Sequence, residues 1–321
     1  MMTKQEALER FRVEVEPILE QSKVQFYEVL EEKVEDFVEI LQDVLEKLKV
    51  RIEELEKEKI MFFHFSLMRI GILQQTYEAL VQAMDARWYL DTEIASVPFS
   101  LDVLFTFFND IRQQLTEKSR KYQGKVNFYD IEHCIEETIM ACNSLLVQQL
   151  RFMFRDIEEN PTFSAIEKTQ VWGIYWGEYR DACEIVVQVN REKKTSLDWE
   201  RALRQTKNEE TNLVSSFWYQ MQLKDSDCKG KFLYFIQFEH CELENFCFDE
   251  AMLSGAQFKH CTIKNCSFRN AEVRQAIFLD CHWGNNDFTG ANLENSVISE
   301  DSLPFIHLEP EQLQTIFVDR G

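Results

Sequence analysis

Cysteine and histidine recur at fixed intervals in the last third of the chain, where they could bind a metal ion. The stretches FEHCEL, FKHCTI and FLDCHW begin at Phe238, Phe258 and Phe278, twenty residues apart, and each carries a cysteine at the same offset. Thiolates and imidazoles are zinc ligands when they converge within about 2.0–2.3 Å of one ion. The spacing therefore allows two interpretations, a metal site or a structural repeat of twenty residues.

A five-residue period favours the structural repeat. Every fifth residue from Leu233 to Ile298 is large and apolar, and the residue two positions earlier is mostly small, as at Cys241, Cys261 and Cys281. Neither the 3.6-residue period of a helix nor the two-residue period of a strand produces this pattern. We therefore interpret the three cysteines as small inward-facing residues.

This repeat resembles that of the pentapeptide-repeat family, written A(D/N)LXX. Ala291-Asn292-Leu293 matches it letter for letter, and Ala251-Met252-Leu253 matches it at the two inward positions. The resemblance covers about residues 228–321 and implies a right-handed quadrilateral β-helix, in which residues twenty apart stack. The implied structural columns are Cys241, Cys261 and Cys281; Phe238, Phe258 and Phe278; and Phe248, Phe268 and Phe288.

The histidines of these stretches are expected on the outside of the rod. His240 and His260 follow a central phenylalanine by two positions, so they should point away from the cysteines. Imidazoles and thiols that point in opposite directions do not converge on one ion. We expect a ladder of small residues, no metal and no cofactor.

Helices are predicted to cover the two open ends of the rod. Before the repeats, a helix over 198–223 places Val214, Phe217, Trp218 and Met221 on one face. After them, LEPEQLQTIFV begins a helix at Pro310, a favoured first helical residue, with Leu313, Ile316 and Phe317 as its apolar face.

Residues 1–225 lack the five-residue period, and we predict that they are helical. A 4-3-4-3-4-3 spacing of apolar residues predicts a coiled-coil seam, which would pack on a later helix or on a second copy of the chain. The seam residues are Val34, Val38, Leu41, Leu45, Leu48, Ile52 and Leu55. Further helices are predicted over 63–90, 99–122, 128–158, 162–189 and 198–223.

These patterns predict an α+β multidomain protein. An elongated all-α helical bundle with a coiled coil is followed by a short right-handed quadrilateral β-helix and a C-terminal capping helix. The predicted boundaries are a helical bundle over 1–195, a linking or capping helix over 196–226, the β-helix over 227–300 and a cap helix over 301–321.

Two groups of residues in the helical part are candidates for a binding role. The first is an aromatic stripe, which is either a binding surface or part of the core. It consists of Trp172, Tyr175, Trp176 and Tyr179 on one face of a predicted helix. The second is His64 within MFFHFSLM, which we interpret as a core residue, with a ligand role as the alternative.

Composition limits the function. The formal net charge of -21 disfavours direct binding to nucleic acid, whose phosphates it would repel. A polar N-terminus and the absence of a long apolar run predict a soluble protein without a membrane span.

Nine cysteines without a C-x-x-C pair indicate reduced thiols and a cytoplasmic location. No nucleotide-binding, metalloprotease or nucleophile-elbow motif occurs, so we expect no enzyme.

Two functions remain open. The first is a non-enzymatic adaptor or regulator, in which the helical part recognises a protein or a ligand and the β-helix is a platform or a dimerisation module. The second comes from the resemblance, since several family members imitate duplex DNA and bind DNA gyrase or topoisomerase IV, as resistance or immunity proteins. That role needs outward acids, for which the candidates are Glu239, Glu244, Asp249 and Glu250.

Length and charge weaken the second function. Three and a half coils give a rod of about 17 Å, whereas one turn of DNA spans about 34–36 Å; a homodimer could double the rod. Residues 226–300 hold 11 acidic and 6 basic side chains, so their acidity is modest.

Overall fold

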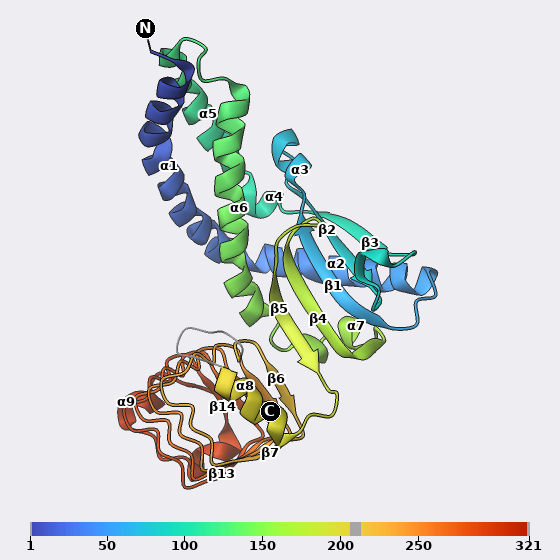
Figure 1. Cartoon of the computed structure of the whole chain (residues 1–321), viewed down its shortest axis with the longest axis vertical. Helices are drawn as coiled ribbons and strands as arrows, with labels where there is room; N and C mark the ends of the chain where they lie inside the picture. The colour runs from blue at the N-terminus through green and yellow to red at the C-terminus, as the bar shows by residue number, and fades with distance from the viewer. Residues whose placement is uncertain (1, 206–212, 320–321) are drawn as a thin grey trace. The chain divides into compact units, whose positions relative to one another are not determined.

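Two compact units, Met1–Val187 and Gln188–Gly321, make up the chain (Figure 1). The computed structural model describes residues 2–205 and 213–319. Long helices come first, and a β-solenoid with a short C-terminal helix follows. The predicted α+β class and the β-solenoid are thereby confirmed, but the first unit also contains a sheet that the helical prediction missed.

The helices of the first unit begin at well-formed caps. Thr3 and Glu6 form a capping box at the start of α1, and Asn127 and Asp130 form one at the start of α6. The helices are α1 (Lys4–Glu32), α2 (Val34–Glu54), α3 (Arg69–Gln74), α4 (Asp102–Phe105), α5 (Phe108–Ser119), α6 (Phe128–Met153) and α7 (Pro161–Ser164). α1, α5 and α6 contact one another and form a three-helix group.

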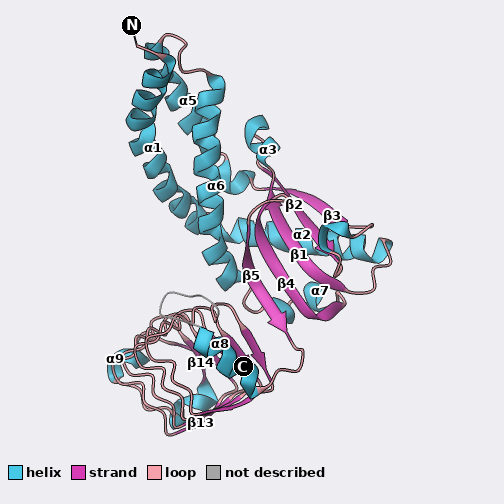
Figure 2. Cartoon of the chain, viewed as in Figure 1, coloured by secondary structure: helices cyan, strands magenta, loops and turns pink. Residues whose placement is uncertain are grey.

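Figure 2 shows the sheet of the first unit, whose strand order is β3-β2-β1-β4-β5. The strands are β1 (Ile60–Leu67), β2 (Glu78–Met84), β3 (Ala95–Ser100), β4 (Lys168–Glu178) and β5 (Cys183–Asn190). β1 pairs antiparallel with β2 and parallel with β4, and β3 pairs antiparallel with β2. Pro98 lies in β3, at the edge of the sheet, where a missing N–H leaves no gap in the ladder.

The helices predicted over 63–90 and 162–189 are therefore wrong. The apolar residues of these stretches also fit the two-residue alternation of a strand. In β1, Phe63, Phe65 and Leu67 are fully buried on one face of the sheet. In β4, a side chain at Gly177 would come within 2.2 Å of the Ala182 carbonyl oxygen, so the glycine permits β5 to approach closely. Tertiary pairing between distant strands overrode the local helical pattern.

The predicted coiled-coil seam is a helix, α2, which packs on the sheet of its own unit and on the short helix α7 instead of forming a coiled coil with another long helix. α2 contacts β2, β3 and α7, and it buries Leu41, Leu45, Leu48 and Ile52. Phe37, outside the predicted seam, packs edge-on against Trp176 of β4 at 6.4 Å between ring centroids. The sheet buries the same apolar stripe of α2 that a coiled-coil partner would bury.

The second unit is a stack of square coils. Six parallel strands lie in one sheet in the order β15-β14-β12-β10-β8-β6, and four lie in another in the order β13-β11-β9-β7. The first sheet contains β6 (Phe217–Tyr219), β8 (Gln237–Glu239), β10 (Gln257–Lys259), β12 (Ile277–Leu279), β14 (Val297–Ser299) and β15 (Phe317–Asp319). The second contains β7 (Gln222–Lys224), β9 (Glu242–Glu244), β11 (Thr262–Lys264) and β13 (His282–Gly284). Residues twenty apart are in register, as at Phe238, Phe258 and Phe278.

Stacked rings and small residues fill the interior of the solenoid. Ring centroids are 5.4 and 4.8 Å apart from Phe238 through Phe258 to Phe278, and 4.8 and 4.6 Å apart from Phe248 through Phe268 to Phe288. The buried thiols of Cys241, Cys261 and Cys281 donate to the carbonyls of Trp218, Phe238 and Phe258, at 3.3, 3.3 and 3.2 Å. Each cysteine therefore links its coil to the previous one.

The first end of the solenoid differs from the prediction. Phe217 and Trp218, expected on a capping helix within 196–226, lie in the first coil, where Trp218 is in register with Phe238. The cap is α8 (Ser196–Gln205), whose Trp199 packs on Trp218 and Phe238 and donates to the Ser226 hydroxyl at 2.9 Å. Residues 206–212 of the helix predicted over 198–223 lie outside the described residues.

The second end is closed by a polar side chain. α9 (Pro310–Leu313) begins at Pro310 as predicted, but Leu313 is half exposed and Phe317 belongs to β15. The buried Gln312 instead donates to the carbonyls of Phe288 and Ala291, both at 2.8 Å. A 3-10 segment over Glu300–Phe305 leads into this cap.

Candidate functional site

The four acids proposed for DNA imitation lie on the outside of the solenoid, where three of them are ion-paired. Glu239 pairs with Arg191 at 3.0 Å, Glu244 with Lys224 at 2.5 Å, and Glu250 with Lys229 at 3.1 Å. Asp249 accepts from the Ser267 hydroxyl and from the backbone N–H of Arg269. The charges of Glu239, Glu244 and Glu250 are thus balanced by basic neighbours, whereas Asp249 is held by neutral donors.

The same pairing continues along the later coils. Arg269 pairs with Asp287 at 2.5 Å, and Arg274 pairs with Glu294 at 2.8 Å. Hydrogen bonds from Thr289 and Arg269 lower the pKa of Asp287 to about 2, so it is ionised at neutral pH. Basic residues of the repeat segment are thus placed against the acids of neighbouring coils.

Outward histidines form a short column without the ligands of a metal site. The rings of His240 and His260 stack at 4.7 Å, and Asp280 lies 3.3 Å from His260 Nδ1. Both histidines have a positive φ, at the corner of their coil. Across residues 2–205 and 213–319, no group of three or more His, Cys, Asp or Glu side chains could hold a metal ion.

The proposed aromatic stripe does not form one face, which corrects the helical interpretation. Trp172 and Trp176 lie in β4 and are buried, and Trp176 Nε1 donates to Asn143 of α6 at 2.7 Å. Tyr175 belongs to the other face of the strand, because successive side chains alternate. Tyr179 lies beyond the end of β4. The two tryptophans are core residues, so the four side chains cannot act together as a binding surface.

His64 lies on the Tyr175 face of the sheet, and its ring is buried. The Tyr89 hydroxyl is 2.5 Å from His64 Nδ1, and the Ser66 hydroxyl is 3.2 Å from it. His64 Nε2 and Oε1 of Gln82, its cross-strand neighbour, are buried and have no partner among the described residues. Burial lowers the pKa of His64 to about 4, so the ring is neutral at pH 7.

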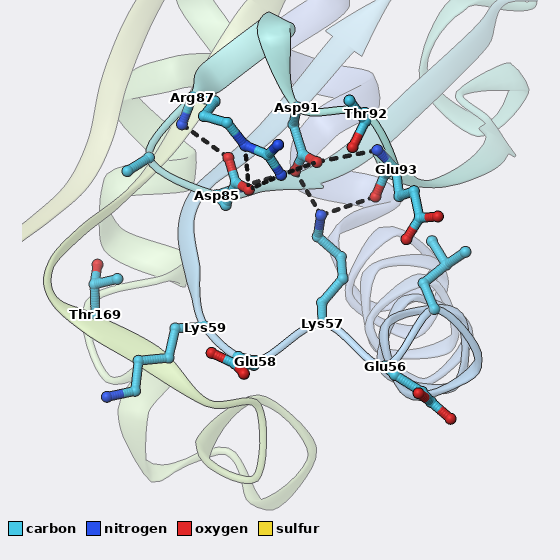
Figure 3. A pocket seen from close by; sticks show the side chains of 12 residues that line it. Glu56, Lys57, Glu58, Lys59, Asp85, Arg87, Asp91, Thr92, Glu93 and Thr169 are labelled. Atoms are coloured by element: carbon cyan, nitrogen blue, oxygen red, sulfur yellow. Dashed lines mark hydrogen bonds and ion pairs between the residues drawn. The ribbon is translucent and has the colours of Figure 1, made fainter.

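A charged hollow of about 420 Å³ lies between the end of α2 and the connection from β2 to β3. Figure 3 shows Lys57 reaching across it to Asp91, 2.5 Å away, and to the Glu93 carbonyl. Arg87 lies beside Asp85 and also contacts Asp91. Burial alone would raise the pKa of Asp91, but hydrogen bonds from Lys57 and from two backbone N–H groups hold it below its ordinary value. These charges fix the connection, and no nucleophile–base pair stands among them.

An apolar groove runs between α1 and α6. Two adjoining hollows of about 420 and 260 Å³ share Arg12 and Cys134 among their lining residues. Leu8, Phe11, Val15 and Leu19 of α1 line the groove at helical spacing. None of the sequence-based predictions included this groove, although the apolar spacing in residues 4–32 indicates it.

No described helix is long and apolar enough to cross a membrane. The nine cysteines are free thiols, six of them in the second unit and most of them buried. Burial raises the pKa of Cys142 to about 12 and that of Cys266 to about 11, so these thiols are not activated as nucleophiles.

A family model described as pentapeptide repeat region matches residues 233–307. A solved pentapeptide-repeat protein, Rfr23 of the cyanobacterium Cyanothece 51142, is 16% identical over 33% of this chain and 86% of its own, with a TM-score of 0.28. HetL, a pentapeptide-repeat protein involved in heterocyst differentiation regulation in a Nostoc cyanobacterium, is 14% identical over 27% and 48%, with a TM-score of 0.16.

QnrB1, a plasmid-mediated fluoroquinolone resistance protein, is 11% identical over 34% of this chain and 85% of its own, with a TM-score of 0.16. No curated protein matches the chain significantly. With TM-scores this low, the three solved proteins say nothing about the activity of this chain.

Proposed function

We propose, on the premise that the C-terminal part of the chain is a pentapeptide-repeat β-solenoid, that the chain is a non-enzymatic interaction protein. The solenoid acts as a rigid platform, and the N-terminal unit recognises a protein partner through the groove between α1 and α6. A cytoplasmic location belongs to the proposal and agrees with the free thiols.

One observation carries the proposal: the groove is open, whereas three of the four candidate acids on the solenoid are ion-paired. Val13 and Tyr129, which both line the groove, are 70% and 79% exposed. Exposed apolar side chains that gather around a hollow are typical of a protein-binding surface. The ion pairs of Glu239, Glu244 and Glu250 instead reduce the anionic face that imitation of DNA needs.

The experiment is affinity capture with three full-length baits, followed by mass spectrometry. The first bait is the unaltered chain, the second carries Val13→Arg and Leu19→Arg in the groove, and the third carries Glu239→Lys, Glu244→Lys and Glu250→Lys on the solenoid. We expect a partner that the solenoid variant retains and the groove variant loses at least tenfold. Circular dichroism of each bait checks that it is folded.

The opposite pattern would move the function to the solenoid. A subunit of DNA gyrase or topoisomerase IV that is captured by the groove variant and lost by the solenoid variant would support the DNA-imitation alternative. A partner that both variants retain would contradict both functions.

A further inference from the structure

Shape and charge of the groove define the chemistry of its occupant. We propose that the groove binds a basic amphipathic helix of a partner protein, about three turns long. This inference rests on the proposed function, because it names the class of partner that the same groove recognises.

The floor of the groove has the length and the apolar character that a helix needs. Leu8 and Leu19 are eleven residues apart on α1, which corresponds to about 17 Å at 1.5 Å per residue. Phe11 and Val15 lie between them and are buried, while both leucines are partly exposed. An amphipathic helix inserts apolar side chains at i, i+3 or i+4 and i+7 into such a floor.

Within the three-helix group, α1 is covered on one flank. That flank meets α5 and the turn after it, where Tyr122 packs against Phe11 at 5.8 Å between centroids and donates to Glu14 at 2.8 Å. On the groove side, Val13 and Tyr129 remain largely exposed. A further helix laid along α1 and α6 would complete a four-helix arrangement, the packing in which such apolar seams are buried.

Pro17 shapes the groove from within α1. A proline inside a helix has no N–H for the carbonyl four residues earlier, here that of Val13, and it bends the helix. α1 is visibly curved along its length (Figure 1).

Charge selects a basic occupant over an acidic one. The residues that line the two hollows include five carboxylates but only one guanidinium, that of Arg12. The carboxylates are Glu9, Glu16, Glu20, Asp130 and Glu137, of which Glu20 is ion-paired with Lys23 at 2.7 Å. Complementary charge at the rim selects partners and speeds association. A second copy of this chain, with a net charge of -21, would bring like charge to the rim.

The test presents the folded full-length chain with a displayed library of 18-residue amphipathic helices. Their apolar face is fixed as Leu and Phe at i, i+3, i+4 and i+7, and their flanking positions are randomised among Lys, Arg, Gln and Glu. We expect Lys and Arg to be enriched at the flanks. A selected peptide, synthesised with a fluorophore, should lose at least tenfold in affinity for the variant Glu16→Lys with Glu20→Lys.

A matched control carries Glu28→Lys and Glu31→Lys, the same change of charge on exposed residues of α1 that do not line the groove. Its affinity should stay within twofold of that of the unaltered chain. A library that yields no binder, that enriches Glu, or whose peptides bind both variants equally well overturns the inference. If affinity capture still finds a groove-dependent partner in those cases, the proposed function stands and only the class of occupant is wrong.

Discussion

At the scale of single residues, burial determines the chemistry of this protein. The cysteines that repeat every twenty residues donate their S–H groups to carbonyls of the coil below. Burial raises the pKa of Cys261 far above its ordinary value, which removes its reactivity as a thiolate. His64 is likewise kept neutral by burial, which links the stability of the first unit to pH.

We predict that His64 makes the first unit less stable in mild acid. Its pKa is about 4 in the folded chain and about 6.5 when unfolded, so the unfolded state binds a proton first. The His64 contribution is fully present above pH 6.5 and is lost as pH falls towards 4. It amounts to roughly 2–3 kcal/mol between pH 7 and pH 4.5.

Urea unfolding of the chain and of His64→Gln at both pH values measures this contribution. The variant should lose less unfolding free energy on acidification, since carboxylates that titrate in the same range are common to both proteins. Equal losses in the two proteins would show that His64 does not titrate as its burial implies.

At the scale of elements, each end of the solenoid is stabilised by one side chain that meets exposed backbone or rings. Trp199 of α8 covers the first coil, and Gln312 of α9 satisfies two carbonyls of the last. A buried carbonyl without a donor costs about 1–3 kcal/mol. Polar closure of this kind is needed because a stack of coils otherwise ends in unpaired groups.

We predict that Gln312→Ala loosens the last coil. The Ala291 carbonyl loses its donor, whereas the Phe288 carbonyl keeps the Ala291 N–H at 2.9 Å, and the loss should be about 1–3 kcal/mol. Hydrogen exchange followed by mass spectrometry should show faster exchange in peptides spanning 287–299. The neighbouring Leu313→Ala is the control, because Leu313 is half exposed and should change exchange little. Similar effects of the two substitutions would contradict the capping role of Gln312.

At the scale of the whole molecule, the distribution of charge matters more than its total. The net charge of -21 is compatible with imitation of DNA, but basic side chains are placed against the acids of the solenoid. The longer stack found in the structure, six strands in its main sheet, would suit that role better than the predicted length. We nevertheless favour the adaptor function, because three candidate acids of the solenoid are ion-paired and the first unit has an open groove.

We predict that the purified chain does not inhibit supercoiling by DNA gyrase, even at tenfold molar excess over the enzyme. The physical reason is that Arg191, Lys224 and Lys229 neutralise three of the outward acids that would have to replace phosphates, namely Glu239, Glu244 and Glu250. A gel assay of plasmid supercoiling measures it. Inhibition at stoichiometric amounts that disappears in the Glu239→Lys, Glu244→Lys and Glu250→Lys variant would contradict the prediction.

The solenoid could be predicted from the sequence because its determinants are local. Each five-residue unit places one large and one small side chain inward, so the five-residue period from Leu233 to Ile298 is enough to predict the solenoid. The first coil was missed because Phe217 and Trp218 also fit a helical spacing. The groove was within reach of the same kind of reasoning, through the apolar spacing of α1.

Only the tertiary structure decided the rest, because it depends on contacts between distant segments. β1 pairs with β4 more than a hundred residues away, and this pairing turns two apparently helical stretches into strands. It also divides Trp176 and Tyr175 between opposite faces of the sheet, which no helical spacing indicates. Arg191 reaches Glu239 across 48 residues. Sequence patterns report which side chains must be buried, but the partner that buries or neutralises them is determined by the fold.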